Sequence, residues 1–98
     1  MKMTDHQKQL WQSMIDSIQQ FINGETCDFY GLVGDLEGML DASEIKNKEL
    51  VERWYDFWTP LEIRRSIEGN DIEKKNAMQE LVALQIFLKT QLKNEPVF

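Results

Sequence analysis

The sequence predicts an all-α fold: a single compact bundle of four to five helices with a kink or a restart at Pro60. Apolar residues recur at three- and four-residue steps along most of the chain, which is the spacing of one face of an α-helix. With 5 glycines and 2 prolines in 98 residues, the chain also lacks the turns that many short strands need. A chain of this length has room for one core, so we expect one domain over residues 1–98, with frayed ends at 1–3 and 95–98.

The first expected helix begins after Thr4, which is a suitable N-cap, and Gln7 completes a capping box three residues later. Asn23-Gly24 supplies a left-handed stop at the other end. Between these two signals runs one apolar stripe, formed by Leu10, Trp11, Met14, Ile15, Ile18, Phe21 and Ile22.

The second expected helix runs from about Thr26 or Asp28 to Asp41. Its apolar residues fall within a band about 120° wide: Phe29, Leu32, Val33, Leu36, Met39 and Leu40. Three glycines lie on the opposite side of the helix, and each costs roughly 1 kcal/mol relative to alanine. This cost predicts a role for them, either in a binding surface or in close packing against another helix of the bundle.

A third helix is expected after a polar connection in which Ser43 or Asn47 is the next cap. Glu49 and Arg53 have the i,i+4 spacing of an ion pair on its polar side. Pro60 offers no amide hydrogen to the helix and clashes one turn back, which predicts the kink or restart. The apolar face of this helix consists of Leu50, Val51, Trp54, Phe57, Trp58 and Leu61.

The last helix is expected to follow a break at Gly69-Asn70, to be capped by Asn70 or Asp71, and to run toward Lys93. One apolar line follows a heptad-like spacing: Ala77, Leu81, Leu84, Leu88 and Leu92. A second apolar set makes the segment apolar nearly all round: Met78, Val82, Ile86 and Phe87. Such a helix is either the central element of the bundle or an oligomer interface, so a homodimerising structural or regulatory protein is an alternative function.

The middle of the chain carries the whole charge imbalance. The net charge is −6, whereas residues 25–62 alone sum to −7. Such a surface repels phosphate backbones, which argues against a nucleic-acid partner, and it steers a basic protein toward it. The simpler interpretation is that the acidic face keeps a small protein soluble. The ten acids are Glu25, Asp28, Asp35, Glu37, Asp41, Glu44, Glu49, Glu52, Asp56 and Glu62.

Few residues suit catalysis or metal binding, so we expect no catalytic residue, metal site or cofactor. One cysteine, Cys27, and one histidine, His6, exclude a disulfide framework, thiolate metal sites and most catalytic triads. The chain shows no secretory signal and no apolar run of the ~18 residues that a membrane span needs. A lone cysteine favours a reducing compartment, so we expect a cytoplasmic protein without membrane contact.

One spacing of carboxylates raises an enzymatic alternative. Glu49-x-x-Glu52 followed by Glu68-x-x-Asp71 resembles the magnesium site of MazG-type nucleotide pyrophosphohydrolases. That resemblance implies four carboxylates that converge on Mg²⁺ from two helices. The second pair straddles Gly69-Asn70, however, where the sequence predicts a helix break.

The predicted partner-binding surface is the glycine side of the second helix, extended by acidic and aromatic residues of the third. The glycines form a shallow floor that a partner backbone can approach closely. Acidic residues surround this floor, and tyrosines serve as contact residues. The predicted binding residues are Asp28, Tyr30, Gly31, Gly34, Asp35, Glu37, Gly38, Asp41, Glu49, Glu52, Tyr55 and Asp56.

Three stretches carry a family resemblance: residues 22–25 (Ile-Asn-Gly-Glu), residues 32–41 (Leu-Val-Gly-Asp-Leu-Glu-Gly-Met-Leu-Asp), and the aromatic segment 54–62. This layout, over about residues 15–90, is similar to short all-helical bacterial immunity proteins encoded beside contact-dependent or polymorphic toxins. The resemblance implies a non-enzymatic inhibitor that binds a toxin domain, often a basic nuclease, and blocks its active site. Immunity proteins share no common residue set, so the resemblance transfers no binding residue to this chain.

Overall fold

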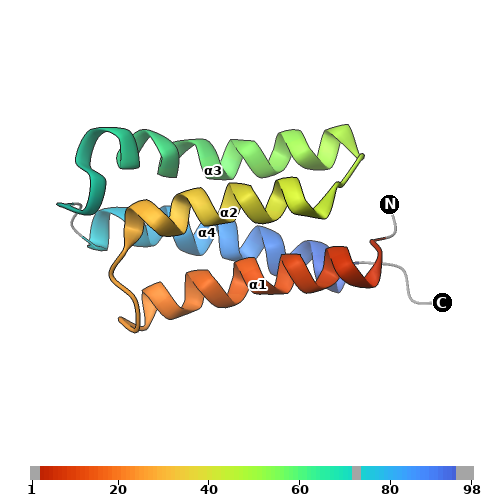
Figure 1. Ribbon diagram of the computed structural model, residues 1–98, viewed down its shortest axis with the longest axis horizontal. Helices are drawn as coiled ribbons and strands as arrows, with labels where there is room; N and C mark the ends of the chain where they lie inside the picture. Colours follow the sequence, from red (N-terminus) through yellow and green to blue (C-terminus); the bar gives the residue numbers. More distant parts are fainter. Residues whose placement is uncertain (1–2, 72–73, 95–98) are drawn as a thin grey trace.

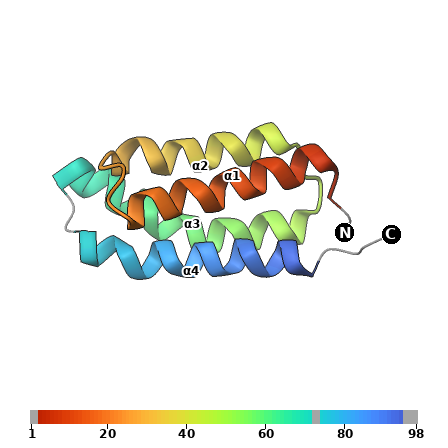
Figure 2. The ribbon, with the colours of Figure 1, turned by 90° about the horizontal axis from the view of Figure 1, so that it is seen from below.

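The computed structural model describes residues 3–71 and 74–94, which form four α-helices and one short 3₁₀ turn. The elements are α1 (Asp5–Ile22), α2 (Phe29–Ser43), α3 (Lys48–Glu68), η1 (Gly69–Asp71) and α4 (Lys74–Lys93). The helices lie side by side along one long axis (Figures 1 and 2). Within the described residues, α1 packs against α2 and α4, and α3 packs against α2 and α4. The predicted all-α bundle is therefore confirmed, as a ring of four helices in which α4 takes one corner.

The first three helices begin at predicted caps. Thr4 and Gln7 form both halves of a capping box at α1, and Asp28 and Asn47 accept backbone hydrogen bonds at the starts of α2 and α3. After α1, Gly24 has a φ of 81° and reverses the chain, as its position predicts.

The expected restart at Pro60 is wrong, because α3 continues through this proline to Glu68. Proline removes one backbone hydrogen bond of a helix. Here Trp58 and Leu61 are buried on either side of it. Burial of these side chains holds both halves of the helix against the same core, so residues 3–71 and 74–94 form four α-helices rather than five.

Asn70 and Asp71, the expected caps of the last helix, belong to η1, and α4 is described from Lys74 onward. Asn70 instead caps α2 from a distance: its Oδ1 accepts the backbone N–H of Tyr30 at 2.8 Å, and its Nδ2 donates to Asp28 Oδ1 at 3.2 Å. Residues 72–73, which precede α4, lie outside the described part of the chain.

The N-terminal end also differs from expectation. Met3, placed in a frayed end, is only 2% exposed and belongs to the core. Residues 1–2 and 95–98, the rest of the two expected frayed ends, lie outside the described residues.

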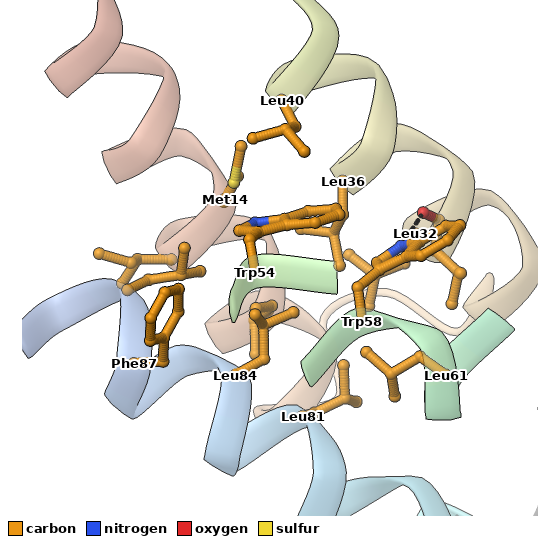
Figure 3. Packing of buried hydrophobic residues seen from close by; sticks show 14 of the residues in the cluster. Met14, Leu32, Leu36, Leu40, Trp54, Trp58, Leu61, Leu81, Leu84 and Phe87 are labelled. Atoms are coloured by element: carbon orange, nitrogen blue, oxygen red, sulfur yellow. Dashed lines mark hydrogen bonds between the residues drawn. The ribbon is translucent and has the colours of Figure 1, made fainter. Parts of the chain in front are cut away.

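The predicted apolar stripes meet in one core that holds three indole rings. Two of these rings, Trp54 and Trp58, are seen in Figure 3. Trp54 and Trp58 stack with their ring centroids 5.6 Å apart. The Nε1 of Trp11 donates to the Leu88 carbonyl of α4 at 2.9 Å, and that of Trp58 donates to the Val33 carbonyl of α2 at 3.0 Å. The buried Nε1 of Trp54 has no hydrogen-bond partner among the described residues.

No described helix combines the length and apolar character of a membrane span.

Trp11 and Trp54 provide a matched test, because both are 0% exposed and only Trp11 donates a hydrogen bond. We expect Trp11→Phe to lower the free energy of unfolding by about 1–2 kcal/mol more than Trp54→Phe, since a lost hydrogen bond adds to the cavity. Urea denaturation of the two variants measures the difference. Equal losses would show that the Trp11 bond contributes nothing.

Candidate protein-binding surface

None of the twelve predicted binding residues is buried, but the structure does not gather them into one surface. Eight of them belong to α2 and its N-cap: Asp28, Tyr30, Gly31, Gly34, Asp35, Glu37, Gly38 and Asp41. The other four lie in the first half of α3: Glu49, Glu52, Tyr55 and Asp56.

The glycines of α2 have three different surroundings. A Cβ on Gly31 would collide with the side chain of Asp28, and a Cβ on Gly34 would come within 2.9 Å of an Arg65 nitrogen. A Cβ on Gly38 would meet nothing within 4 Å. The close-packing alternative therefore applies at Gly34, and an open floor exists only around Gly38.

Arg65 of α3 explains the packing at Gly34. Its guanidinium lies 4.8 Å from the ring centroid of Tyr30 and forms a 2.6 Å ion pair with Glu62. Without a side chain at Gly34, the guanidinium can lie close to α2 and stack on Tyr30. The i,i+3 spacing of Glu62 and Arg65 is visible in the sequence, but the contact with α2 is not, so sequence analysis missed this residue.

Tyr55 joins the same two helices at another level, about 15 Å from Arg65 along α3. Its hydroxyl donates a 3.0 Å hydrogen bond to Glu37 Oε2. Burial, this hydrogen bond, and the negative charges of Glu37 and Asp41 raise the pKa of Tyr55 to about 12. Tyr55 and Glu37 are therefore engaged with each other, which leaves Asp41 as the exposed acid at this edge.

Asp28 has a structural role at the start of α2. Its carboxylate accepts hydrogen bonds from the Gly31 amide and the Asn70 side chain, and these lower its pKa. Asp28 and Asp35 also line a shallow hollow between α1 and α2, with Ser17 and Gln20 on the opposite wall. The exposed carboxylate of Asp35 is thus the free acid on this edge of α2.

The acids of α3 form a separate strip. Tyr55 faces α2, whereas Phe57 faces α4 and stacks on Phe87 at 4.9 Å. Successive helical residues are 100° apart, so Asp56 lies between these directions and points outward. Glu49 and Glu52 are likewise exposed on this side, away from the glycine floor.

The expected ion pair between Glu49 and Arg53 is not among those formed by the described residues. The Arg53 guanidinium instead lies 5.4 Å from the ring centroid of Phe87. Packing on an aromatic ring of α4 therefore replaces the local pairing that the spacing suggested.

The carboxylates of the magnesium alternative do not converge. Glu52 and Glu68 lie 16 residues apart on one continuous helix, a rise of about 24 Å. A single Mg²⁺ holds its ligands at about 2 Å. Among the described residues, no three acids, cysteines or histidines are grouped so that they could hold a metal ion.

Gly38 and Gly34 provide a matched pair for testing their different surroundings. We expect Gly38→Ala to raise the free energy of unfolding by about 1 kcal/mol, because alanine favours the helix and the space is open. Gly34→Ala should give no gain, since its Cβ displaces Arg65 from Tyr30. Thermal and urea denaturation report both values, and an equal gain in the two variants would contradict the packing role of Gly34.

Tyr55 should dominate the alkaline pH dependence of stability. Its pKa is raised above the ordinary value of 10.0, so its contribution to stability is complete below pH 10 and is lost as the pH rises toward 12. In a Tyr30→Phe variant, Tyr55 is the remaining tyrosine, and tyrosinate absorbance should give a midpoint of about 12. Adding Glu37→Gln should lower that midpoint. A midpoint unchanged by Glu37→Gln would show that the carboxylate does not act on Tyr55.

No protein-family model matches the chain, and neither the curated proteins nor the solved structures contain a significant match to it.

Proposed function

We propose that the chain is a non-catalytic protein-binding module, an immunity-type inhibitor that binds a basic toxin nuclease domain in the cytoplasm. The exposure of the acidic segment 25–62 carries this proposal. Eight of its ten acids are exposed, and Glu37 and Glu62 are half-buried. Among the described residues, Glu62 alone of the ten forms an ion pair, with Arg65. The negative charge is therefore available to an external partner rather than neutralised within the chain.

The surface that we assign to this partner is centred on Gly38. Asp35 and Asp41 lie three residues before and after it, so their carboxylates flank the glycine on the same side of α2. All three residues are exposed, and no atom lies within 4 Å of a Cβ built on Gly38. A lysine or arginine of the partner can thus lie against the helix between two carboxylates.

The partner chemistry follows from this arrangement. A nuclease binds phosphates with clustered lysines and arginines, and these same groups attract carboxylates. An acidic helix placed over such a cluster blocks access of the nucleic acid. Tyr30, 55% exposed at the start of α2, offers an aromatic contact at the edge of the same helix.

The test uses the product of the gene adjacent to the one that encodes this chain. We expect it to be a toxin whose killing of cells is suppressed by co-expression of this chain. Asp35→Asn combined with Asp41→Asn should weaken binding at least tenfold by titration calorimetry, because both carboxylates at the contact are lost. Asp5→Asn with Asp16→Asn changes the net charge equally on α1 and should weaken binding less than threefold.

The Gly38→Leu variant tests the shape of the proposed binding surface without changing its charge. The side chain projects into open space in the free chain, so the fold should be retained while close approach of the partner is blocked. Circular dichroism checks the fold, and loss of toxin neutralisation checks the contact. Unchanged neutralisation, or equal effects of the α1 and α2 charge variants, would refute this surface.

A further inference from the structure

The Tyr30 side chain of α2 is exposed and yet held in place. It is 55% exposed, and the carbon of the Arg65 guanidinium lies over its ring, 4.8 Å from the ring centroid. An exposed aromatic side chain ordinarily exchanges among rotamers, and ordering it on binding costs free energy. A ring that is already ordered in the free chain avoids that cost.

Arg65 is itself fixed by other contacts. One of its nitrogens forms a 2.6 Å ion pair with Glu62 Oε2, one turn earlier on α3. Another lies 2.9 Å from the position of a Cβ on Gly34, so the guanidinium lies directly against α2. The backbone of Tyr30 is held as well, because its N–H donates to Asn70 Oδ1 at 2.8 Å. Ring and backbone of Tyr30 are therefore both attached to α3 and the turn that follows it.

The charge beside Tyr30 is balanced, because Glu62 pairs with Arg65. The guanidinium on the ring also disfavours a second cation there, since the electron-rich face is already engaged. Gly38, by contrast, lies between two carboxylates that form no ion pair among the described residues. Tyr30 thus suits an apolar group, whereas Gly38 suits a cationic one.

We propose that Tyr30 is a second anchor for the toxin and that Arg65 is the residue that positions it. This role rests on the proposed function and specifies what the partner supplies: an apolar cleft for the ring, about 12 Å along α2 from the cationic group at Gly38. The two positions are about 80° apart around the helix, so one partner surface reaches both. The Arg65 side chain, only 20% exposed, acts through the ring rather than by touching the partner.

Arg65→Lys tests the positioning role without any toxin, because lysine keeps the charge but lacks the planar group that stacks on the ring. Hα–Hβ couplings of isotope-labelled tyrosine should show a single χ1 rotamer of Tyr30 in the free chain and averaging in the variant. Gly34→Ala should have the same effect, since its Cβ displaces the guanidinium.

The matched control is Arg64→Lys, one residue earlier on α3, which pairs with Glu80 of α4 and should leave the rotamer unchanged. Averaging of the Tyr30 rotamer in the unaltered chain would overturn the proposal. A single rotamer that persists in Arg65→Lys would overturn it equally.

Titration calorimetry with the toxin encoded by the adjacent gene tests the binding role. Tyr30→Ala should weaken binding at least tenfold, at low and at high salt alike, because the lost contact is apolar. Arg65→Lys should weaken binding about threefold, because a ring spread over three rotamers occupies the binding one a third of the time. In the Tyr30→Ala variant, the same change should cost less than about 1.5-fold, since Arg65 acts only through the ring.

Each remaining outcome decides one part of the proposal, with circular dichroism verifying the fold of every variant. A loss in Tyr30→Ala that disappears at high salt would refute the apolar cleft. An effect of Arg65→Lys that persists without the ring would refute the positioning role. Equal toxin binding by Tyr30→Ala would overturn the anchor and leave the proposed function standing. A chain that binds no toxin would refute the proposed function and the anchor, while the rotamer measurement still decides whether Arg65 positions Tyr30.

Discussion

The position of the acidic edge of α2 depends on the attachment of α2 to α3, in addition to its packing against α1. Three glycines make α2 a poor helix on its own, so tertiary contacts must hold it. The Trp58 indole donates to its Val33 carbonyl, Tyr55 bonds Glu37, and Asn70 caps its first turn. Each of these contacts comes from α3 or from the turn after it, and each fixes a different level of α2. The acidic edge of α2 is therefore presented from a rigid support although its own sequence is a weak helix former.

Contacts that are local in sequence could be predicted, because their signals lie within one or two turns. The apolar stripes, the capping box at Thr4 and the reversal at Gly24 are of this kind. The effect of Pro60 on the helix could not be predicted from the neighbouring sequence, because burial of the residues around it decides whether the helix continues. Asn70 could not be placed either, since its partners lie 40 and 42 residues away. A cap signal read along the chain identifies a suitable residue, but not the helix that it caps.

The candidate surface also combines features that local sequence predicts with features that depend on distant contacts. Spacing correctly placed the glycines opposite the apolar face of α2, and acidic composition correctly indicated exposure. Spacing alone does not say which neighbour approaches that face. Arg65 fills the space at Gly34, whereas nothing fills it at Gly38. The acids of α3 similarly have the right charge but point away from this floor, because the helix that carries Tyr55 toward α2 turns Asp56 outward.

Gly38 gives the strongest reason to look outside the chain for a function. Gly31 and Gly34 have internal reasons, since a side chain at either position meets Asp28 or Arg65. Gly38 has helical backbone geometry that any residue adopts, and alanine would fit there without contact. A glycine at an exposed helical position costs about 1 kcal/mol relative to alanine and contributes no packing in return. Two exposed carboxylates flank this position. In the proposed function, this bare position is where a partner approaches the helix, and the two carboxylates favour a cationic group in that contact.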